Sequence, residues 1–399
     1  MKVLVINCGS STLKFKVIEL TGDTPPGQET RIAHGSIDRI GDRGMVKFIA
    51  ENGSHLQKTE RVTDHSESAL LVLDWLNSLD IRFDAVGHRV VHGGHLFTEP
   101  VFIDDEVANA IDVLKLLAPL HNEPSLMAIH AVRKILGSKI PMTAVFDTTF
   151  HSNMPERSLY YAIPQKLSDK HHIRRYGFHG IAHRYMTERY ATITSIPVER
   201  LRLITLQLGN GCSATAVNGG ISVDTSMGFT PLEGLMMGTR SGDVDPHLPR
   251  FLAESEGVDV KEIEGLLNTK SGLLGVSGLS RDMRELLEAE SRGDARAALS
   301  VEMFCYRVRK QIGAYLSALG GADAVVFGGG IGENSPEVRR RICEKMEWAG
   351  LILDKESNNL TIGTEGCISL DNSRLHACVI SVDEELIIAR DTVRCLSRI

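Results

Sequence analysis

The chain has 399 residues, 42% of them hydrophobic, which is typical of two globular domains and argues against long disordered regions. A formal net charge of −7 gives no electrostatic reason to expect nucleic acid or a membrane surface as a partner. The seven cysteines form no CxxC pair, and no apolar run reaches the roughly 18 residues of a membrane span. We therefore expect a cytoplasmic protein that binds neither nucleic acid nor membrane.

The first 150 residues alternate short apolar runs with segments of helical periodicity. The predicted strands are at residues 3–6, 13–20, 83–87 and 141–146, and the predicted helices at 66–79 and 104–117. A tight polar turn at residues 7–12 separates the first two strands, and the last strand ends at Asp147. Strands that alternate with helices predict an α/β architecture.

The layout of the N-terminus is repeated in the middle of the chain. Residues 203–217 again read as an apolar strand, a glycine-containing turn and a second strand, as residues 3–17 do. Gly9 and Gly209 therefore head equivalent hairpins. The repeat predicts a duplicated fold with two phosphate-facing hairpins and a domain boundary near residues 147–150.

A third glycine-rich segment follows a strand predicted at residues 324–327. We expect a turn at 328–332 and, after it, a helix with Ser335 as its N-cap and Pro336 in its first turn. Glycine lets backbone N–H groups approach a phosphate closely. None of the three glycine turns fits the P-loop or the dinucleotide-binding motif. The remaining nucleotide-binding arrangement is a pair of hairpins that hold the phosphates, as in actin and the sugar kinases.

Three loops place arginine or histidine beside glycines: GHRVVHGG at 87–94, RRYGFHG at 174–180 and MGTRSGD at 237–243. A guanidinium can hold a carboxylate or phosphate with two hydrogen bonds, and neighbouring glycines leave room for the anion to approach. The loops together predict an anion pocket. His179 and His183 are four residues apart but lack the intervening Glu of a zinc protease, so we expect His183 to be structural.

Acidic residues at strand ends could serve the Mg²⁺ that a nucleotide kinase needs, because this ion prefers oxygen ligands. Asp147 follows one strand, and Glu384 and Glu385 follow a strand predicted at 378–382. We expect Glu385 to be a solvated or helix-capping residue.

Six segments together resemble the acetate kinase (acetokinase) family and occur in the family's order along the chain. They are the three loops above and residues 7–14 (NCGSSTLK), 147–151 (DTTFH) and 328–335 (GGGIGENS). The resemblance implies duplicated ribonuclease H-like domains of the acetate and sugar kinase/Hsc70/actin superfamily. It implies reversible transfer of the ATP γ-phosphate to acetate, giving acetyl phosphate and ADP, by a homodimer. The N-terminal domain would comprise residues 1–148 plus 385–399. The C-terminal domain, 149–384, would hold the nucleotide site and dimer interface.

The resemblance also implies site residues, position by position. The catalytic residues would be Asp147, His179 and Arg240. Arg89 would hold the substrate carboxylate beside an apolar wall of Val91, Leu120, Phe178 and Pro231. Asn7 and Glu384 would serve Mg²⁺ or Mn²⁺. ATP or ADP would contact Lys14, Gln207, Leu208, Gly209, Asn210, Gly211, Asp282, Met283, Arg284, Gly330, Ile331, Gly332, Glu333 and Asn334.

The chain departs from the family pattern at two places. Gln207 stands where the family usually has His, and residues 121–125 read HNEPS in place of HNPPN. The phosphoryl donor and the preferred acid, acetate or propionate or butyrate, are therefore left open. A non-catalytic ATP-binding module like actin or Hsp70 is a further alternative. The family assigns Asp147 a proton-transfer role, but a carboxylate substrate is already ionised, so we expect Asp147 to orient Mg²⁺, water or an arginine.

Overall fold

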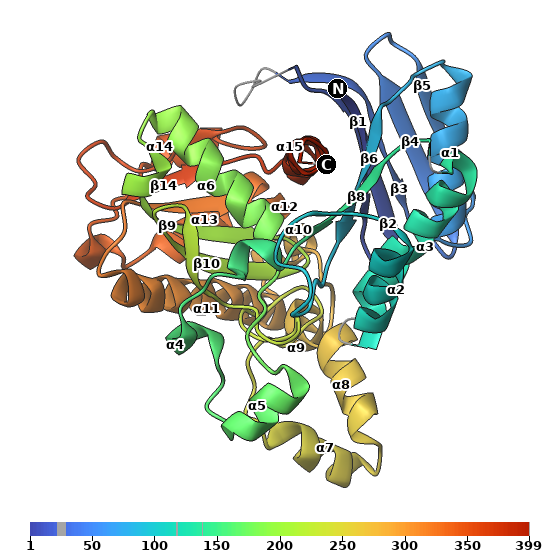
Figure 1. The fold of residues 1–399 in the computed structure, drawn as a ribbon. Coiled ribbons are helices and arrows are strands. Elements are labelled where there is room, and N and C mark those ends of the chain that lie inside the picture. The colour runs from blue at the N-terminus through green and yellow to red at the C-terminus, as the bar shows by residue number, and fades with distance from the viewer. Residues whose placement is uncertain (22–28, 117–118, 138, 399) are drawn as a thin grey trace. The chain divides into compact units, whose positions relative to one another are not determined.

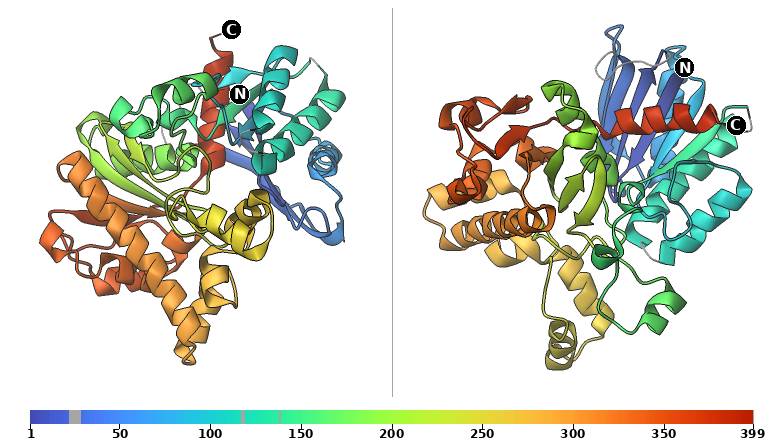
Figure 2. Two further views of the ribbon diagram at one scale, coloured as in Figure 1. Left: turned by 90° about the horizontal axis from the view of Figure 1, so that it is seen from below. Right: turned by 60° about the vertical axis from the view of Figure 1, so that its left-hand side comes forward.

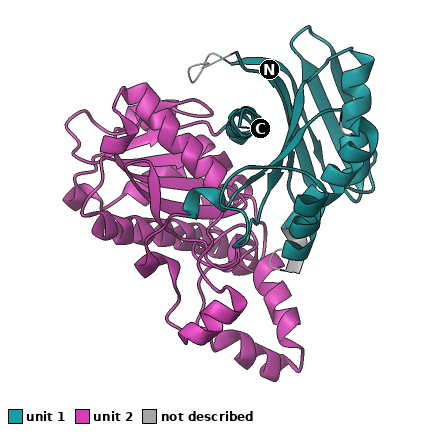
Figure 3. Ribbon diagram, in the orientation of Figure 1, with its two compact units in different colours: residues 1–152, 383–399 teal, residues 153–382 magenta. Residues whose placement is uncertain are grey.

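The computed structural model describes residues 1–21, 29–116, 119–137 and 139–398 (Figure 1). The chain forms two compact units, residues 1–152 with 383–399 and residues 153–382 (Figure 3). The domain boundaries inferred from the sequence stay a prediction. Within the described ranges, no helix is both long and apolar enough to cross a membrane.

The first unit is built on an eight-stranded sheet with the order β5-β4-β3-β2-β1-β6-β8-β7. Its central strand β1 (Lys2–Cys8) pairs antiparallel with β2 (Thr12–Glu19) and parallel with β6 (Ala85–Val90), which pairs parallel with β8 (Met142–Phe146). The other strands are β3 (Thr30–Asp38), β4 (Arg43–Ala50), β5 (His55–Arg61) and β7 (Val101–Phe102).

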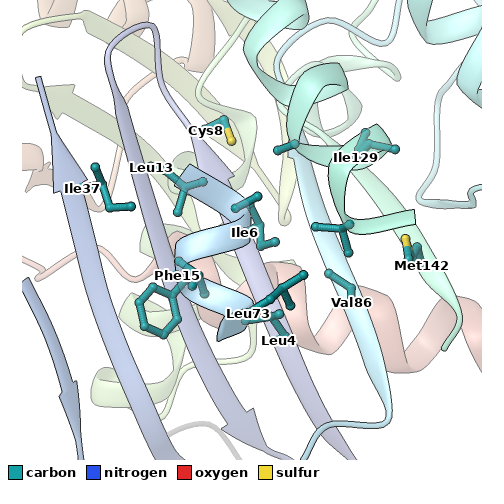
Figure 4. Close-up of a cluster of buried hydrophobic side chains, with 14 of the residues drawn as sticks. Leu4, Ile6, Cys8, Leu13, Phe15, Ile37, Leu73, Val86, Ile129 and Met142 are labelled. Carbon is teal, nitrogen blue, oxygen red and sulfur yellow. The ribbon is translucent and has the colours of Figure 1, made fainter. Parts of the chain in front are cut away.

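Helices cover both faces of this sheet. On one face lie α1 (His65–Ser78), α2 (Asp105–Val113) and α3 (Pro119–Leu136), and on the other α15 (Glu384–Leu396) (Figures 1 and 2). Leu4, Ile6 and Phe15 from the sheet pack with Leu73 of α1 and Ile129 of α3 in the core between them (Figure 4). Burying such a side chain contributes about 1.5–3 kcal/mol, so this core anchors the strands whose ends carry the candidate site.

The second unit repeats the strand order of the first. Its sheet has the order β11-β10-β9-β12-β14-β13. Strand β9 (Arg202–Leu208) pairs antiparallel with β10 (Cys212–Asn218) and parallel with β12 (Ala324–Gly328), and β12 pairs parallel with β14 (His376–Val379). The strands β3-β2-β1-β6-β8 and β11-β10-β9-β12-β14 thus share one order and one set of directions. The predicted duplicated α/β fold is confirmed.

Helices α6 (Gly180–Thr194) and α11 (Ala295–Leu319) lie on opposite sides of β9 and β10 (Figure 1). The remaining α-helices and strands of the second unit are α4 (Glu156–Leu159), α5 (Gln165–His171), β11 (Ile221–Thr225), α7 (Leu248–Glu256), α8 (Val260–Thr269), α9 (Gly272–Ser277), α10 (Met283–Ser291), α12 (Gly329–Asn334), α13 (Pro336–Cys343), α14 (Lys355–Leu360) and β13 (Gly366–Cys367).

The predicted elements differ from the structure mainly at their ends. The helix expected at 104–117 is capped by Asp104, is α-helical to Val113 and continues as a 3₁₀ turn to Leu116, while Leu117 lies outside the described residues. The turn expected at 328–332 is wrong, because residues 329–334 form α12. Gly329 has a φ of 75° and lies against the backbone of Leu208, so the chain enters the helix directly from β12. The N-cap predicted at Ser335 is confirmed, because the Ser335 side chain accepts a hydrogen bond from the Val338 N–H.

Candidate active site

Three neighbouring strands of the first unit bring Asn7, Arg89 and Asp147 together at their carboxyl ends. The Arg89 guanidinium donates to both Asp147 carboxylate oxygens, from Nε at 2.8 Å and from Nη2 at 2.6 Å. Its Nη1 donates to Asn7 Oδ1 at 3.0 Å. The Arg89 side chain is 12% exposed and that of Asp147 1%, so both are shielded from water. Asp147 and Asn7 therefore fix Arg89 in one orientation.

This arrangement leaves Arg89 charged and able to bind a further anion. Burial acts to lower the pKa of Arg89, but Asp147 and Glu384 outweigh it and hold the pKa above its usual range. A guanidinium has five N–H groups, and these three bonds leave one on Nη1 and one on Nη2. Two adjacent donors suit a carboxylate or phosphate.

The acidic residues at the start of α15 form a network with Asn7 and Lys16. Asn7 Nδ2 donates to Glu384 Oε2 at 3.0 Å and to Glu385 Oε1 at 2.9 Å. Lys16 Nζ lies 2.7 Å from Asp383 Oδ2 and 3.3 Å from Glu385 Oε2. The expectation of a solvated or capping Glu385 is wrong: it is buried, and Asp383 caps the helix. Burial acts to raise the pKa of Glu385, but Lys16 and Asn7 hold it below the usual range.

The carboxylate of Glu384 fits a cation site. Burial raises the pKa of Glu384; Arg89 acts to lower it, but with the nearby carboxylates of Asp147 and Glu385 the pKa stays above its usual range, so its negative charge is only partly compensated. A divalent cation would stabilise that charge. In the part of the chain that the structure describes, no group of three or more His, Cys, Asp or Glu side chains could hold a metal. One carboxylate with waters and phosphate oxygens is the kind of site that Mg²⁺ takes, so the residues fit this ion.

In the second unit, a chain of hydrogen bonds fixes His179. This residue caps α6 with a φ of 56°, a strained backbone for a residue other than glycine. Its Nδ1 lies 2.8 Å from Ser213 Oγ, which also lies 2.7 Å from His183 Nε2. His183 Nδ1 in turn lies 2.8 Å from Thr205 Oγ1. His183 is fully buried, so the structural role expected for it is confirmed.

Sequence reasoning missed Ser213 and Thr205. The available signal was a hydroxyl residue inside the apolar run 203–206 and another directly before the run 214–217. In the structure both side chains are buried and both bond to His183. Besides packing in the sheet, these two hydroxyl groups therefore hold His183 in place, and Ser213 also holds His179.

Gly211 brings His179 and Arg240 together. A Cβ on Gly211 would lie 3.3 Å from His179 Cε1 and 3.6 Å from Arg240 Nη1. Gly238, two residues before Arg240 in the sequence, donates its N–H to Asn210 O at 2.9 Å, which holds the MGTRSGD loop on the hairpin turn. Burial lowers the pKa of Arg240, so a bound anion would stabilise its charge. A side chain at 211 would occupy the space between the His179 and Arg240 side chains.

The glycine segment 330–334 lies next to the same hairpin, because Gly328 pairs with Gln207 across β12 and β9. A Cβ on Gly330 would meet nothing within 4 Å, so its backbone faces open space. The Glu333 carboxylate instead faces the fold. It accepts from Gly329 N at 2.9 Å and Val382 N at 3.1 Å, and thereby fixes the segment.

Gln207, where the sequence departs from the pattern of the family that it resembles, has an unusual environment. Among the described residues, its buried Oε1 has no hydrogen-bond partner. Leaving a buried acceptor unsatisfied costs about 1–3 kcal/mol. A ligand or water that donates to this oxygen would recover that free energy.

Other parts of the cationic loops serve packing. A Cβ on Gly87 would lie 2.4 Å from Thr392 Oγ1, so the absence of a side chain at Gly87 allows α15 to pack closely and does not make room for an anion. Burial lowers the pKa of His88 to about 3, which leaves its imidazole neutral. Arg175 is bound to the Glu233 carboxylate at 2.6 Å. Of the charged side chains in these loops, Arg89 in the first unit and His179 and Arg240 in the second therefore stay the candidates for anion binding.

Several predicted contacts stay predictions. Lys14 is exposed on β2 opposite Asn7, and Asp282, Met283 and Arg284 open α10, where Asp282 caps the helix. Of the apolar wall, Val91 belongs to the first unit, Phe178 and Pro231 belong to the second, and the Leu120 side chain lies outside the described residues.

In the HNEPS segment, the Asn122 side chain makes two hydrogen bonds to the backbone of His92. Its Oδ1 accepts from the His92 N–H, and its Nδ2 donates to the His92 carbonyl oxygen. It thereby fixes the end of the GHRVVHGG loop.

A family model described as the acetokinase family matches residues 2–390. The acetate kinase of Solibacter usitatus is 49% identical over 407 residues, covering 99% of this chain and 98% of that protein. The acetate kinase of Thermotoga maritima is 47% identical over 409 residues, with both chains fully covered. The structure matches that of Porphyromonas gingivalis acetate kinase with a TM-score of 0.89 and 41% identity over 99% of each chain. It matches a propionate kinase from Francisella tularensis with a TM-score of 0.90 and 39% identity, covering 98% of this chain and 99% of that one.

Proposed function

The chain belongs to the acetokinase family, and on that premise we propose that it catalyses reversible, Mg²⁺-dependent transfer of the ATP γ-phosphate to acetate, giving acetyl phosphate and ADP. The single observation that supports this best, beside the family match, is the buried Arg89, which Asp147 and Asn7 hold with two N–H groups left over. Such a group recognises a small carboxylate.

Arg89 would bind the acid through those two N–H groups and orient one carboxylate oxygen for attack on phosphorus. The oxygen is already ionised at neutral pH, so the attack needs no general base. Both oxygens of Asp147 are engaged by Arg89. We therefore assign Asp147 a positioning role, as the sequence led us to expect, in place of proton transfer.

His179, Arg240 and the backbone N–H groups of the Gly209–Gly211 turn would stabilise the charge that develops on the transferring phosphoryl group. Groups fixed in place before reaction are the main source of such stabilisation. His179 is fixed by Ser213, and Arg240 is held by its bond to Pro231 O at 3.3 Å. Glu384, oriented by Asn7, would hold Mg²⁺, which when bound neutralises part of the charge on the nucleotide phosphates.

Propionate is the second candidate acceptor, because a structure titled as a propionate kinase matches over nearly the whole chain. A coupled assay of ADP release with ATP and acids of two to four carbons tests both. We expect the highest kcat/KM with acetate. A higher value with propionate would favour the second candidate, and ADP release that does not depend on any acid would overturn the proposed function.

We also propose that the protein is a cytoplasmic homodimer. The support is the family resemblance, together with seven cysteines that are all free, as suits a reducing compartment. Light scattering during size-exclusion chromatography should give twice the chain mass of 43.8 kDa.

A further inference from the structure

Two cysteines face each other at the edge of the second sheet. Cys367 of β13 is the direct partner of Cys378 of β14 in an antiparallel pair. The next pair along, Ile368 and Ala377, is joined by a hydrogen bond from Ile368 N to Ala377 O at 2.8 Å. Because hydrogen-bonded and non-hydrogen-bonded pairs alternate, Cys367 and Cys378 occupy a non-hydrogen-bonded pair, where Cα atoms lie about 4.5 Å apart and side chains are closest.

This geometry permits a disulfide without movement of the backbone. Disulfides usually join Cα atoms about 4.4–6.8 Å apart, with side chains directed toward one another. Direct partners on adjacent strands point to the same face of a sheet, so the two Sγ atoms lie on one side of β13 and β14. Cys367 is exposed and can meet an oxidant in solution, whereas Cys378 is buried.

The surroundings also divide the two thiols into an attacking and a resolving group. The hydrogen bond from Cys378 lowers the pKa of Cys367 to about 5, against the effect of partial burial, and Ser369 lowers it further. The same bond, with burial, raises the pKa of Cys378. By contrast, burial raises the pKa of Cys8, Cys212, Cys305 and Cys343 to about 12. A thiolate that is exposed and has a low pKa is the reactive form of cysteine.

We propose that Cys367 and Cys378 are a peroxide-sensitive site that forms a reversible disulfide, independently of the phosphotransfer reaction. The Cys367 thiolate attacks hydrogen peroxide; an S–O bond forms, the O–O bond breaks, and a sulfenic acid and hydroxide result. The Cys378 sulfur then displaces the sulfenic oxygen as water, with its own proton, and the S–S bond forms. Two thiols lose two electrons, peroxide becomes water, and a dithiol reductant reverses the step.

The test uses the full-length protein. It is treated with a small excess of hydrogen peroxide, its remaining thiols are alkylated, and it is mapped by peptide mass spectrometry. We expect one cross-linked peptide pair joining Cys367 to Cys378, lighter by two hydrogen atoms than the separate peptides and released by dithiothreitol. The Cys395→Ser variant is the matched control, because this partly exposed cysteine has a raised pKa; its cross-link should be unchanged.

Two variants sharpen the result. Cys367→Ser, at an exposed position, should abolish the cross-link and leave Cys378 unreacted. Cys378→Ser should leave Cys367 as a sulfenic acid that dimedone traps. The proposal would be overturned if both cysteines of the wild type were still alkylated after peroxide treatment, or if Cys367 became a sulfinic acid while Cys378 stayed a thiol. Because the wild-type map decides between these outcomes, a variant that fails to fold does not affect the test.

Discussion

Replacing Asp147 by Asn tests whether this residue acts through Arg89. Asn keeps the shape and one oxygen acceptor but loses the charge and one of the two bonds, of 2.6 and 2.8 Å, that Asp147 accepts from the guanidinium. A hydrogen bond to a charged group contributes about 1.5–3 kcal/mol. At about 1.4 kcal/mol per tenfold change, kcat/KM for the acid should fall roughly 10- to 150-fold. The KM for ATP should change little, because Arg89 is assigned to the acid.

A double-mutant cycle with Arg89→Ala makes the test specific. Arg89→Ala alone should raise the KM for the acid more than the KM for ATP. If Asp147 acts by holding Arg89, adding Asp147→Asn to Arg89→Ala should cost almost nothing, so the coupling energy should equal the cost of Asp147→Asn alone, about 1.5–3 kcal/mol. Arg133→Ala is the control: it breaks an ion pair of 2.7 Å in which Asp105 is 89% exposed. Such surface pairs contribute about 0–1 kcal/mol, so kinetics and unfolding should barely change.

Two results would refute this reasoning. Fully additive effects of the two substitutions would give Asp147 a role that does not pass through Arg89. Loss of one limb of the pH–rate profile in Asp147→Asn would restore the proton-transfer role. A second substitution, Asp147→Ala, tests stability by urea denaturation. It leaves the buried Arg89 without its carboxylate partner, so we expect the free energy of unfolding to fall by about 3–5 kcal/mol.

Three further predictions concern the second unit. His179→Ala and Arg240→Ala should each lower kcat by about 10²–10³-fold with a smaller effect on KM, while the exposed Arg250→Ala should not; near-native kcat would remove the residue from the transition state. Ser213→Ala, which deletes the oxygen between the two histidines, should lower kcat about 2- to 10-fold, and an unchanged kcat would show that the chain does not position His179. Gln207→His should lower the KM for ATP or raise kcat by a few-fold to about tenfold. If the wild type were active only with pyrophosphate, among ATP, GTP and pyrophosphate, ATP would be excluded as donor.

Local sequence signals predicted the hairpins and missed what depends on tertiary contacts. The strand–turn–strand pattern around Gly9 and Gly209 is complete within about fifteen residues, so it was readable. The helical start at Gly329 was not, since a glycine-rich segment locally favours a turn, and close packing on Leu208 decides its conformation.

The same distinction holds for the candidate site. Asp147 was singled out as a candidate because it ends a strand and lies within a motif. Glu385 was misread because its burial depends on Asn7, 378 residues away in the chain, and on Lys16. The Ser213 bridge was missed because a serine at the end of a glycine-containing turn is ordinarily a turn residue, and only the fold places it between two histidines.

Phosphoryl transfer to a carboxylate can be followed directly by ³¹P NMR with acetate labelled with ¹⁸O in both carboxylate positions. If a carboxylate oxygen attacks the γ-phosphorus, an acyl phosphate resonance should grow in step with ADP and carry the isotope shift of one bridging ¹⁸O. Arg89→Ala should suppress both signals at low acetate concentrations. Release of inorganic phosphate with ADP, and no acyl phosphate, would contradict the proposed reaction and favour an ATP-hydrolysing module.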